Sequence, residues 1–185
     1  MKLILLRHED RNLLNPLFFT PLTDLGMTRR YQLIEPLSKE NIDIIYSSPF
    51  LRTLETVYPT AQFLKKKVNV EYGLYEYVHN PLFTLTDWYH DVSELWKEHP
   101  HLKEMINHRY QSLIQEDDFE IMENEKRLEK RLTPFLMKLL REDSQKTVLL
   151  VTHGGVINKI KDMLIQKTPM NDYFPMGNFE VFILP

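Results

Sequence analysis

Short runs of apolar residues recur along this chain and are separated by longer stretches in which apolar positions follow a helical spacing. Residues 3–6 and 148–151 are apolar at every position. Runs of this length are typical of strands that are buried on both faces of a parallel sheet. Residues 42–46 and 68–70 predict two more strands, and residues 179–184 predict a last or edge strand.

The stretches between these runs predict crossover helices. Thr23 is a good N-cap for a helix over residues 23–37 that Pro36 helps to end, and residues 51–64 predict a second helix despite Pro59. A third helix opens at residues 154–155, and one face of it carries Val156, Ile157, Ile160, Met163 and Leu164. Strands that alternate with helices indicate an α/β fold, and we expect a three-layer sandwich with helices flanking a mostly parallel central sheet.

Residues 81–143 predict helices without intervening strands. One amphipathic helix is indicated by Trp88, Val92, Leu95 and Trp96, and a longer apolar stripe by Leu128, Leu132, Phe135, Leu136 and Leu139. The Thr133–Pro134 pair is a candidate break in the longer helix. We expect the whole segment to be a helical insertion over one end of the sheet, with the acidic tract at 116–118 as a solvated loop.

Length and composition are those of one globular domain over residues 1–185. The chain carries a net charge of −3, which gives no general attraction to nucleic acid, and it has no cysteine. The missing thiols exclude disulfides, thiolate metal sites and cysteine-dependent phosphatase chemistry. The first apolar run is too short for a signal or membrane segment, so a cytoplasmic location without membrane contact is expected. The basic run at 65–67 is expected to be a solvated helix end.

Several chemically active side chains follow directly after predicted strands. Arg7 and His8 follow the first run, His153 follows residues 148–151, and Arg52 comes shortly after Ser47 and Ser48 at the end of the run at 42–46. Ligands of open α/β sheets bind outside the carboxyl ends of the strands, so these groups are expected to converge. Two imidazoles and two guanidiniums describe a pocket that can bind a phosphoryl group and attack its phosphorus.

Four ordered motifs resemble those of the histidine phosphatase superfamily, the phosphoglycerate-mutase-like proteins. They are LRHED at 6–10, PLTDLG at 21–26, SSPFLRTLET at 47–56 and VTHGGV at 151–156. Their order and spacing match along nearly the whole chain. A single Arg-His pair would be a weak signal, whereas four motifs in this order are specific.

The resemblance implies roles for the residues in these motifs. His8 would attack phosphorus as a neutral imidazole and form a phosphohistidine, which divides one difficult displacement into two easier ones. Arg7, Arg52 and His153 would bind the phosphoryl oxygens, next to Gly154. No metal or other cofactor is implied, and the remaining histidines lack metal-ligand spacing. The expected activity is therefore a metal-independent phosphomonoesterase, and the predicted insertion would lie over its active site.

The leaving group also needs a proton donor, for which the family uses an acidic residue after the third strand. Glu71 and Glu76 are both available, and similarity to the family's Gly-Leu-aromatic-Glu-aromatic version favours Glu76. Tyr75 and Tyr77 flank Glu76 and are expected to desolvate it and raise its pKa towards that of a general acid. His79 is expected at the pocket rim.

Two other functions would use the same residues. One is phosphoglycerate-mutase-type phosphoryl transfer, although mutases of this family tend to be longer. The other is a noncatalytic protein that binds a phosphorylated ligand, because Glu9 stands where the family usually has glycine. A carboxylate there would repel substrate unless it points away or pairs with an arginine such as Arg11.

The expected partner is a small phosphorylated metabolite or a phosphoprotein, bound as substrate. The sequence does not select between them. A homodimer formed by edge-strand pairing at residues 179–184 also stays open.

Overall fold

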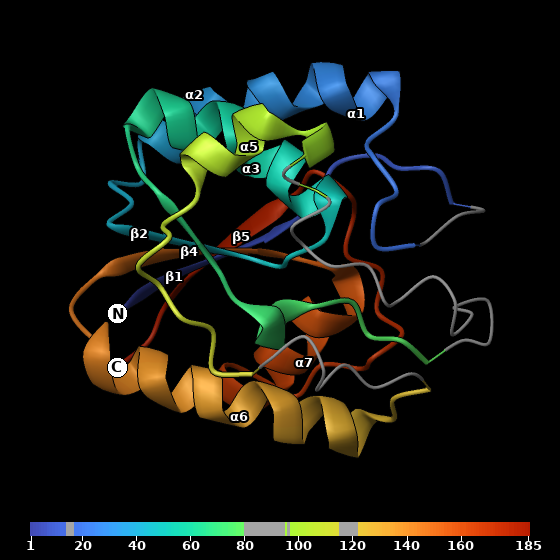
Figure 1. Cartoon of the computed structure of the whole chain (residues 1–185). Coiled ribbons are helices and arrows are strands. Elements are labelled where there is room, and N and C mark those ends of the chain that lie inside the picture. Colours follow the sequence, from blue (N-terminus) through green and yellow to red (C-terminus); the bar gives the residue numbers. More distant parts are fainter. Residues whose placement is uncertain (14–16, 80–94, 96, 115–121) are drawn as a thin grey trace.

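Five strands form the central sheet of the computed structural model, which describes residues 1–13, 17–79, 95, 97–114 and 122–185 (Figure 1). They are arranged in the order β3-β2-β4-β1-β5, and their bounds are β1 (Lys2–Arg7), β2 (Ile44–Ser47), β3 (Val68–Val70), β4 (Thr147–Thr152) and β5 (Phe179–Ile183). β1 to β4 run parallel, and β5 pairs antiparallel with β1. All the predicted strands are confirmed, including the edge position of the last.

The apolar run in β1 is continuous because successive side chains enter two different cores. Ile4 and Leu6 pack with residues of the helix Leu51–Leu64 on one face of the sheet. Leu3 and Leu5 pack on the other face with residues of the helices Glu125–Glu142 and Gly154–Leu164. Strand side chains alternate between faces, so a strand covered on both sides is apolar at every position.

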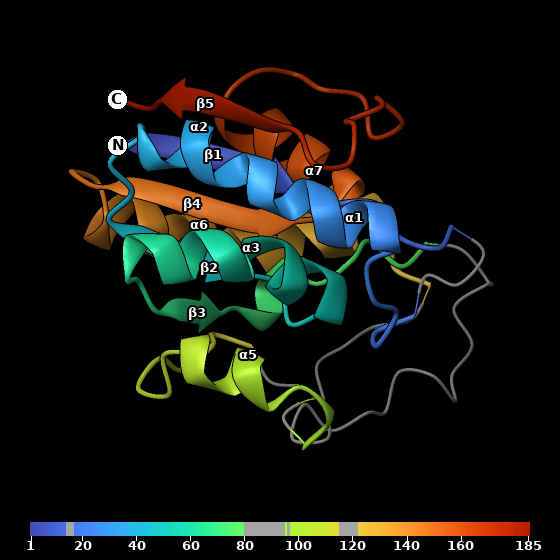
Figure 2. The same ribbon diagram turned by 90° about the horizontal axis from the view of Figure 1, so that it is seen from above.

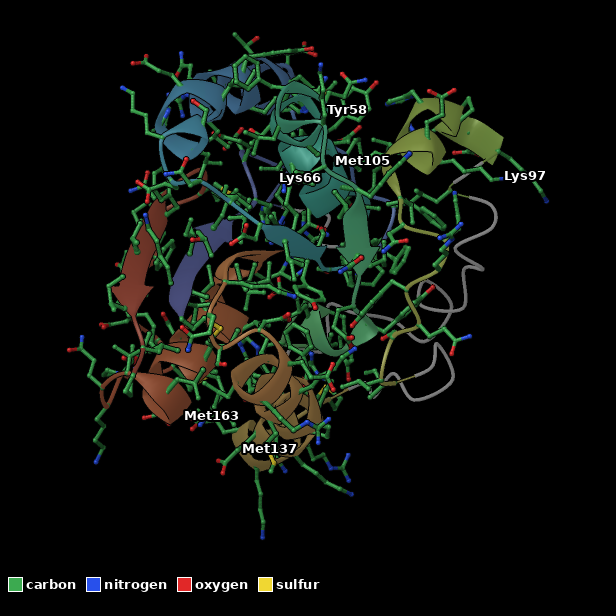
Figure 3. The ribbon with its side chains drawn as sticks, turned by 90° about the vertical axis from the view of Figure 1, so that its left-hand side faces the viewer. Tyr58, Lys66, Lys97, Met105, Met137 and Met163 are labelled. Carbon is green, nitrogen blue, oxygen red and sulfur yellow. The ribbon has the colours of Figure 1, made fainter. Side chains whose placement is uncertain are left out.

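Helices cover both faces of this sheet and complete the expected three-layer α/β sandwich. The upper layer in Figure 1 holds α1 (Asp24–Arg29), the 3-10 turn η1 (Arg30–Leu33), α2 (Ile34–Ser38), α3 (Leu51–Leu64) and α5 (Pro100–Met105). The lower layer holds α6 (Glu125–Glu142) and α7 (Gly154–Leu164). Figure 2 shows α1, α2 and α3 lying over the sheet and running roughly along its strands when seen from above. In Figure 3, the labelled Tyr58 and Met105 belong to the layer of α3 and α5, and Met137 and Met163 belong to the layer of α6 and α7.

The helix predicted over residues 23–37 is interrupted. Thr23 caps it as expected, since its hydroxyl accepts a hydrogen bond from the Gly26 N–H at 3.2 Å. The segment is then divided into α1, η1 and α2, and Pro36 lies inside α2, which ends at Ser38. A proline lacks the N–H of a helical residue, and the tighter 3-10 turn just before α2 places Pro36 in the first turn of a new helix, where that N–H is not needed.

The predicted break at Pro134 is wrong, because α6 is continuous from Glu125 to Glu142. Asn124 caps the helix by accepting the Arg127 N–H at 3.0 Å. The apolar stripe of α6 is buried against the sheet and α7, and it consists of Leu128, Leu132, Phe135, Leu136 and Leu139. Burial of five large side chains outweighs the cost of about 3 kcal/mol that an internal proline carries.

The predicted insertion over residues 81–143 needs a correction. Its longest helix, α6, belongs to the lower layer of the sandwich and does not lie over an end of the sheet (Figure 1). α5 packs beside α3. The helix expected around Trp88 and Trp96 and the acidic tract at 116–118 lie outside the described residues. No helix in the described part of the chain is both long and apolar enough to cross a membrane.

Candidate active site

His8 is fixed immediately after β1 by three hydrogen bonds. Its backbone N–H donates to the Thr152 carbonyl at 3.0 Å, and its carbonyl accepts from the Gly177 N–H at 3.0 Å. Its ring Nδ1 lies 2.7 Å from the Glu9 carbonyl, so Nδ1 carries the proton and Nε2 keeps its lone pair. Nε2 is buried and has no hydrogen-bond partner among the residues that the structure describes. The fold therefore selects the tautomer whose free lone pair is on Nε2.

His153 follows β4 and faces His8 across the carboxyl end of the sheet. The two ring centroids are 5.3 Å apart, with an angle of 62° between the ring planes. Nε2 of His153 lies 2.9 Å from Oγ of Ser48, and its Nδ1 lies 3.2 Å from Oε2 of Glu76. The pattern of the sequence placed Ser48 at this edge of the sheet but gave no sign of its contact with His153.

Arg7 reaches the same edge from the last position of β1. Its Nη1 donates to the carbonyl of Phe174, and its buried Nε has no hydrogen-bond partner within the described ranges. Gly154 lies against this guanidinium, because a Cβ added there would come within 3.4 Å of Cζ of Arg7. Gly154, the first residue of α7, thus leaves room for the Arg7 side chain.

Arg52 is completely buried in the first turn of α3. Its Nη1 donates to the Leu17 carbonyl at 2.8 Å, its Nη2 donates to Oε2 of Glu76 at 3.3 Å, and its Cζ lies 4.4 Å from the centroid of the Phe50 ring. Burial lowers the pKa of Arg52 to about 9, and the charge of Glu76 opposes that shift. Arg52 therefore remains a cation at neutral pH and holds Glu76 in place.

Glu76 lies between a cation and an imidazole, and its pKa moves opposite to the expected direction. Burial by itself would raise the pKa, as expected from Tyr75 and Tyr77. A hydrogen bond from His153 and the positive charge of Arg52 together outweigh burial and hold the pKa of Glu76 well below its usual range. The expected rise is thus wrong, because its reasoning took account of sequence neighbours but not of groups that the fold brings close. Glu76 is therefore a carboxylate at neutral pH.

Both imidazoles are neutral near pH 7. Burial lowers the pKa of His8 well below its usual value, and the charge of Arg52 lowers it further. Burial likewise lowers the pKa of His153 to about 4, although Glu76 opposes the shift. A neutral His8 is the form that can act as a nucleophile. With Arg7 and Arg52 charged and Glu76 ionised, the pocket keeps an excess of positive charge that suits an anion.

The other candidate proton donor, Glu71, has its carboxylate occupied by hydrogen bonds that hold the fold together. It is fully buried and accepts hydrogen bonds from the Gly73 N–H at 2.9 Å, from the Ser112 hydroxyl at 2.8 Å and from the Tyr110 hydroxyl. These donors connect η2 (Tyr72–Leu74) with the loop after α5. Glu71 therefore fastens the segment that precedes Glu76.

Glu9 points away from the histidines. Its buried carboxylate accepts the Asp10 N–H at 3.3 Å and fills the space beside Gly177, where an added Cβ would come within 2.2 Å of Oε1. Its backbone N–H donates to Oγ1 of Thr56 at 2.9 Å. Burial raises the pKa of Glu9, and Arg29 opposes the rise. A carboxylate next to His8 was expected to be tolerated if it points away from the site, and Glu9 meets this condition.

Arg11 is a third guanidinium near the site that the motifs did not identify as a ligand. Burial lowers its pKa, and the charge of Glu76 raises it. Its charge in turn helps to lower the pKa of His153. Its Nη1 donates to the carbonyl of Asn12 at 2.8 Å. The only sequence signal was its place in the loop that follows the first strand.

A metal ion is one alternative occupant of this site. Single donor atoms of His8, Glu76 and His153 lie within 4.8 Å of one another, and these are residue types that bind zinc. The adjacent guanidiniums of Arg7 and Arg52 repel a cation, however, and one of them already binds Glu76. The arrangement therefore fits a phosphoryl group better than a metal.

A cavity of about 430 Å³ opens beside the histidines. Arg7, Glu76 and Gly154 form the part next to the histidines, and His79 lies on the wall, as expected from the sequence. The remaining lining residues are Tyr77, Glu125, Gly155, Met170, Asn171, Asp172, Tyr173 and Phe174. The cavity therefore adjoins the place where Arg7 and Glu76 meet the two histidines.

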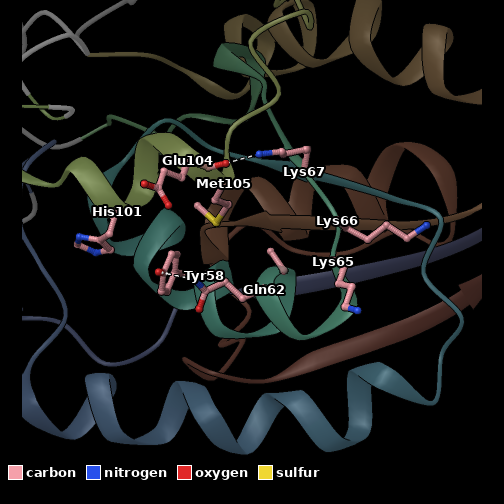
Figure 4. Close-up of a pocket in the computed structure, with 9 residues that line it drawn as sticks. Tyr58, Gln62, Lys65, Lys66, Lys67, His101, Glu104 and Met105 are labelled. Carbon is pink, nitrogen blue, oxygen red and sulfur yellow. Dashed lines mark hydrogen bonds between the residues drawn. The ribbon is translucent and has the colours of Figure 1, made fainter.

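A second cavity, of about 300 Å³, lies between α3 and α5 and contains none of these residues. Figure 4 shows Tyr58, His101, Glu104 and Met105 around it, with Lys65 and Lys66 extending away from the centre. Lys67 donates to the carbonyl of Glu104. The basic run at 65–67 is thus the end of a helix and the turn after it, as expected.

The fold and these side chains together define an α/β sandwich with a buried anion site made from two histidines and two arginines at the carboxyl ends of parallel strands. A sequence model of the histidine phosphatase superfamily (branch 1) matches residues 19–184, and the chain belongs to this superfamily. The match begins after Arg7 and His8, so the assignment of these two residues depends on their geometry.

Solved structures of phosphatases share the fold. Phosphoserine phosphatase from Entamoeba histolytica, in complex with phosphoserine, has a TM-score of 0.67 and 23% identity over 98% of this chain and 90% of its own. A mycobacterial glucosyl-3-phosphoglycerate phosphatase has a TM-score of 0.67 and 20% identity over 97% and 88%. The ecdysone phosphate phosphatase from Bombix mori has a TM-score of 0.64 and 19% identity over 97% and 88%. No curated protein matches the sequence.

Proposed function

We propose that this protein hydrolyses phosphomonoesters without a metal, through a phosphohistidine at His8. The observation that carries the proposal is the state of the His8 ring. Its Nδ1 donates to a backbone carbonyl, and its buried Nε2 has no hydrogen-bond partner in the described part of the chain, although two arginines lie at the same site. A lone pair held free beside two guanidiniums is suited to attack phosphorus.

In the first step, a bond forms between Nε2 of His8 and phosphorus while the bond from phosphorus to the ester oxygen breaks. Arg7 and Arg52 donate to the nonbridging oxygens, whose charge they stabilise throughout the transfer. The bound phosphoryl dianion also favours protonation of His153, which then adds a donor.

The proton for the leaving oxygen comes with the substrate. Because Glu76 is ionised before substrate binds, a phosphate ester that binds as a monoanion transfers its proton to Glu76 and becomes the dianion that the arginines prefer. Glu76 then donates this proton to the departing alkoxide. In the second step, Glu76 accepts a proton from water while the water oxygen bonds to phosphorus and the bond from phosphorus to Nε2 breaks.

One alternative function is that of a noncatalytic protein that binds a phosphorylated ligand, which Glu9 suggested because it replaces the usual glycine. The Glu9 carboxylate lies beside Gly177 and not in the proposed phosphoryl pocket. This position of the carboxylate supports catalysis, because the charge of Glu9 then does not face the bound phosphoryl group. Mutase-type transfer differs from hydrolysis only in the acceptor and is tested by adding alcohols during turnover and looking for new phosphate esters.

The direct test is hydrolysis of p-nitrophenyl phosphate in the presence of EDTA. We expect wild-type activity to survive the chelator and His8→Ala to lower kcat by about 10³-fold or more. His108→Ala is the matched control, because His108 is exposed and outside the site. Turnover in His8→Ala equal to that of wild type would refute the proposal.

A further inference from the structure

The cavity beside the histidines has walls that the fold holds in place. Asn158, which is buried in α7, donates to the carbonyls of Met170 and Asp172 at 3.2 and 2.7 Å. On the other side, Tyr77 packs on Gly155, where an added Cβ would lie 3.2 Å from the tyrosine ring. The cavity is therefore a formed subsite for the alcohol part of an ester.

The charge of this subsite is negative away from the phosphoryl group. Its described lining contains Glu125 and Asp172, and its one cation is Arg7, which the proposed function assigns to phosphoryl oxygens. Lys159 lies 3.7 Å from Glu125 but closer, at 3.2 Å, to Asp162, so one lysine is shared by two carboxylates. Within the described ranges, Asp172 forms no ion pair. A carboxylate on the alcohol would meet two like charges and, among the described residues that line the cavity, no cation besides Arg7.

The same walls offer neutral groups for contact. The rings of Tyr77 and His79 stack with centroids 4.6 Å apart and an angle of 17° between their planes. Burial and the charges of Glu125 and Glu123 raise the pKa of Tyr77, so its phenol stays neutral. Asn171 adds an amide to the lining. Aromatic faces and neutral polar groups suit an uncharged alcohol that bears hydroxyl groups or a ring.

We propose that Glu125 and Asp172 make this protein selective for phosphate esters whose alcohol carries no negative charge. The proposal rests on the function proposed above and deepens it by naming the class of substrate. The two carboxylates act by repelling acidic alcohols, so selectivity comes from exclusion as well as from fit.

The test compares glycerol 3-phosphate with 3-phosphoglycerate, which are alike in size and differ by a carboxylate in place of a hydroxymethyl group. Each ester competes with p-nitrophenyl phosphate at constant ionic strength, and its competition constant is measured for wild type, for Glu125→Gln/Asp172→Asn, and for Glu129→Gln. The last variant removes a charge from the same helix, at an exposed position outside the cavity lining.

We expect wild type to bind glycerol 3-phosphate about tenfold more tightly than 3-phosphoglycerate, despite the greater total charge of the latter. The double variant should reduce this ratio to about twofold by improving 3-phosphoglycerate, and Glu129→Gln should leave it unchanged. Equal constants in wild type, an unchanged ratio in the double variant, or no competition by either ester would overturn the inference. Loss of p-nitrophenyl phosphate hydrolysis itself would instead count against the proposed function.

Discussion

Oε2 of Glu76 lies 3.2 Å from Nδ1 of His153, which joins the candidate acid to a histidine that follows a different strand. Together with Arg52, this contact holds the pKa of Glu76 well below its usual range. The proposed donor role therefore requires that a bound phosphoryl group, through its negative charge, raise the pKa of Glu76 again.

The role of Glu76 as proton donor predicts a dependence on the leaving group. Glu76→Gln should lower kcat for an alkyl phosphate by about 10²- to 10⁴-fold, because an alkoxide leaves poorly without a proton. The loss with p-nitrophenyl phosphate should be much smaller, because nitrophenolate needs little protonation. Steady-state kinetics with both substrates check this. Equal losses with the two substrates would show that Glu76 does not protonate the leaving group.

The buried imidazoles predict that the protein loses stability as the pH falls below 6.5. The pKa values of His8 and His153 in the folded state lie below the ordinary 6.5, so the unfolded chain binds protons first as the pH falls. The free energy of unfolding should be highest above pH 6.5 and decrease as the pH approaches 4, where His153 also titrates in the folded state. The shift of His153 corresponds to about 3 kcal/mol. Glu76 acts in the same direction, but only below 4.5.

Urea titrations between pH 6.5 and 4.5 measure this effect, and His153→Gln should flatten the pH dependence even if it lowers stability overall. An unfolding free energy that stays constant over this interval in wild type would contradict the assignment of neutral, buried imidazoles.

We expect Arg131 to position Glu76, because it binds the carbonyl of the preceding residue, Tyr75. Its guanidinium donates to both carboxylate oxygens of Glu123, at 2.8 and 2.7 Å, and to the carbonyls of Gly73 and Tyr75, at 2.6 and 3.1 Å. Arg131→Met should lower the free energy of unfolding by about 3–5 kcal/mol, because it leaves Glu123 buried and unpaired. It should also reduce kcat more for an alkyl phosphate than for p-nitrophenyl phosphate. Exposed Arg141→Met is the control, and an equal loss on both substrates would leave Arg131 with a structural role alone.

The Glu9 carboxylate occupies the space that a side chain at Gly177 would need. Because the Glu9 carboxylate points away from the histidines, Glu9→Gly should change kcat/KM by less than about threefold, well under 1 kcal/mol. Gly177→Ala should destabilise the protein by at least about 1 kcal/mol, since its φ is +71° and its Cβ would meet Glu9. Chemical unfolding and kinetics of both variants check this. A tenfold gain in activity for Glu9→Gly would show that the carboxylate does impede turnover.

The strands and the residues at their ends were predictable because burial on two faces leaves a continuous apolar run and because parallel strands bring their carboxyl ends together. Interactions between segments that are distant in the sequence were not predictable. The break expected at Pro134 does not occur, because the apolar stripe of α6 packs against the sheet and α7. The pKa of Glu76 depends on Arg52 and His153, which lie far from it in the sequence. The direction of the Glu9 side chain depends on Gly177, and no local pattern encodes that contact.

The central claim is that phosphoryl transfer passes through Nε2 of His8, and rapid acid-free quenching during turnover tests it most directly. We expect an acid-labile phosphoryl group on the peptide that contains His8, attached at Nε2 because Nδ1 is held by the Glu9 carbonyl. Phosphorus NMR distinguishes the two ring positions. Turnover without phosphate on His8, or with phosphate on Nδ1, would contradict the account.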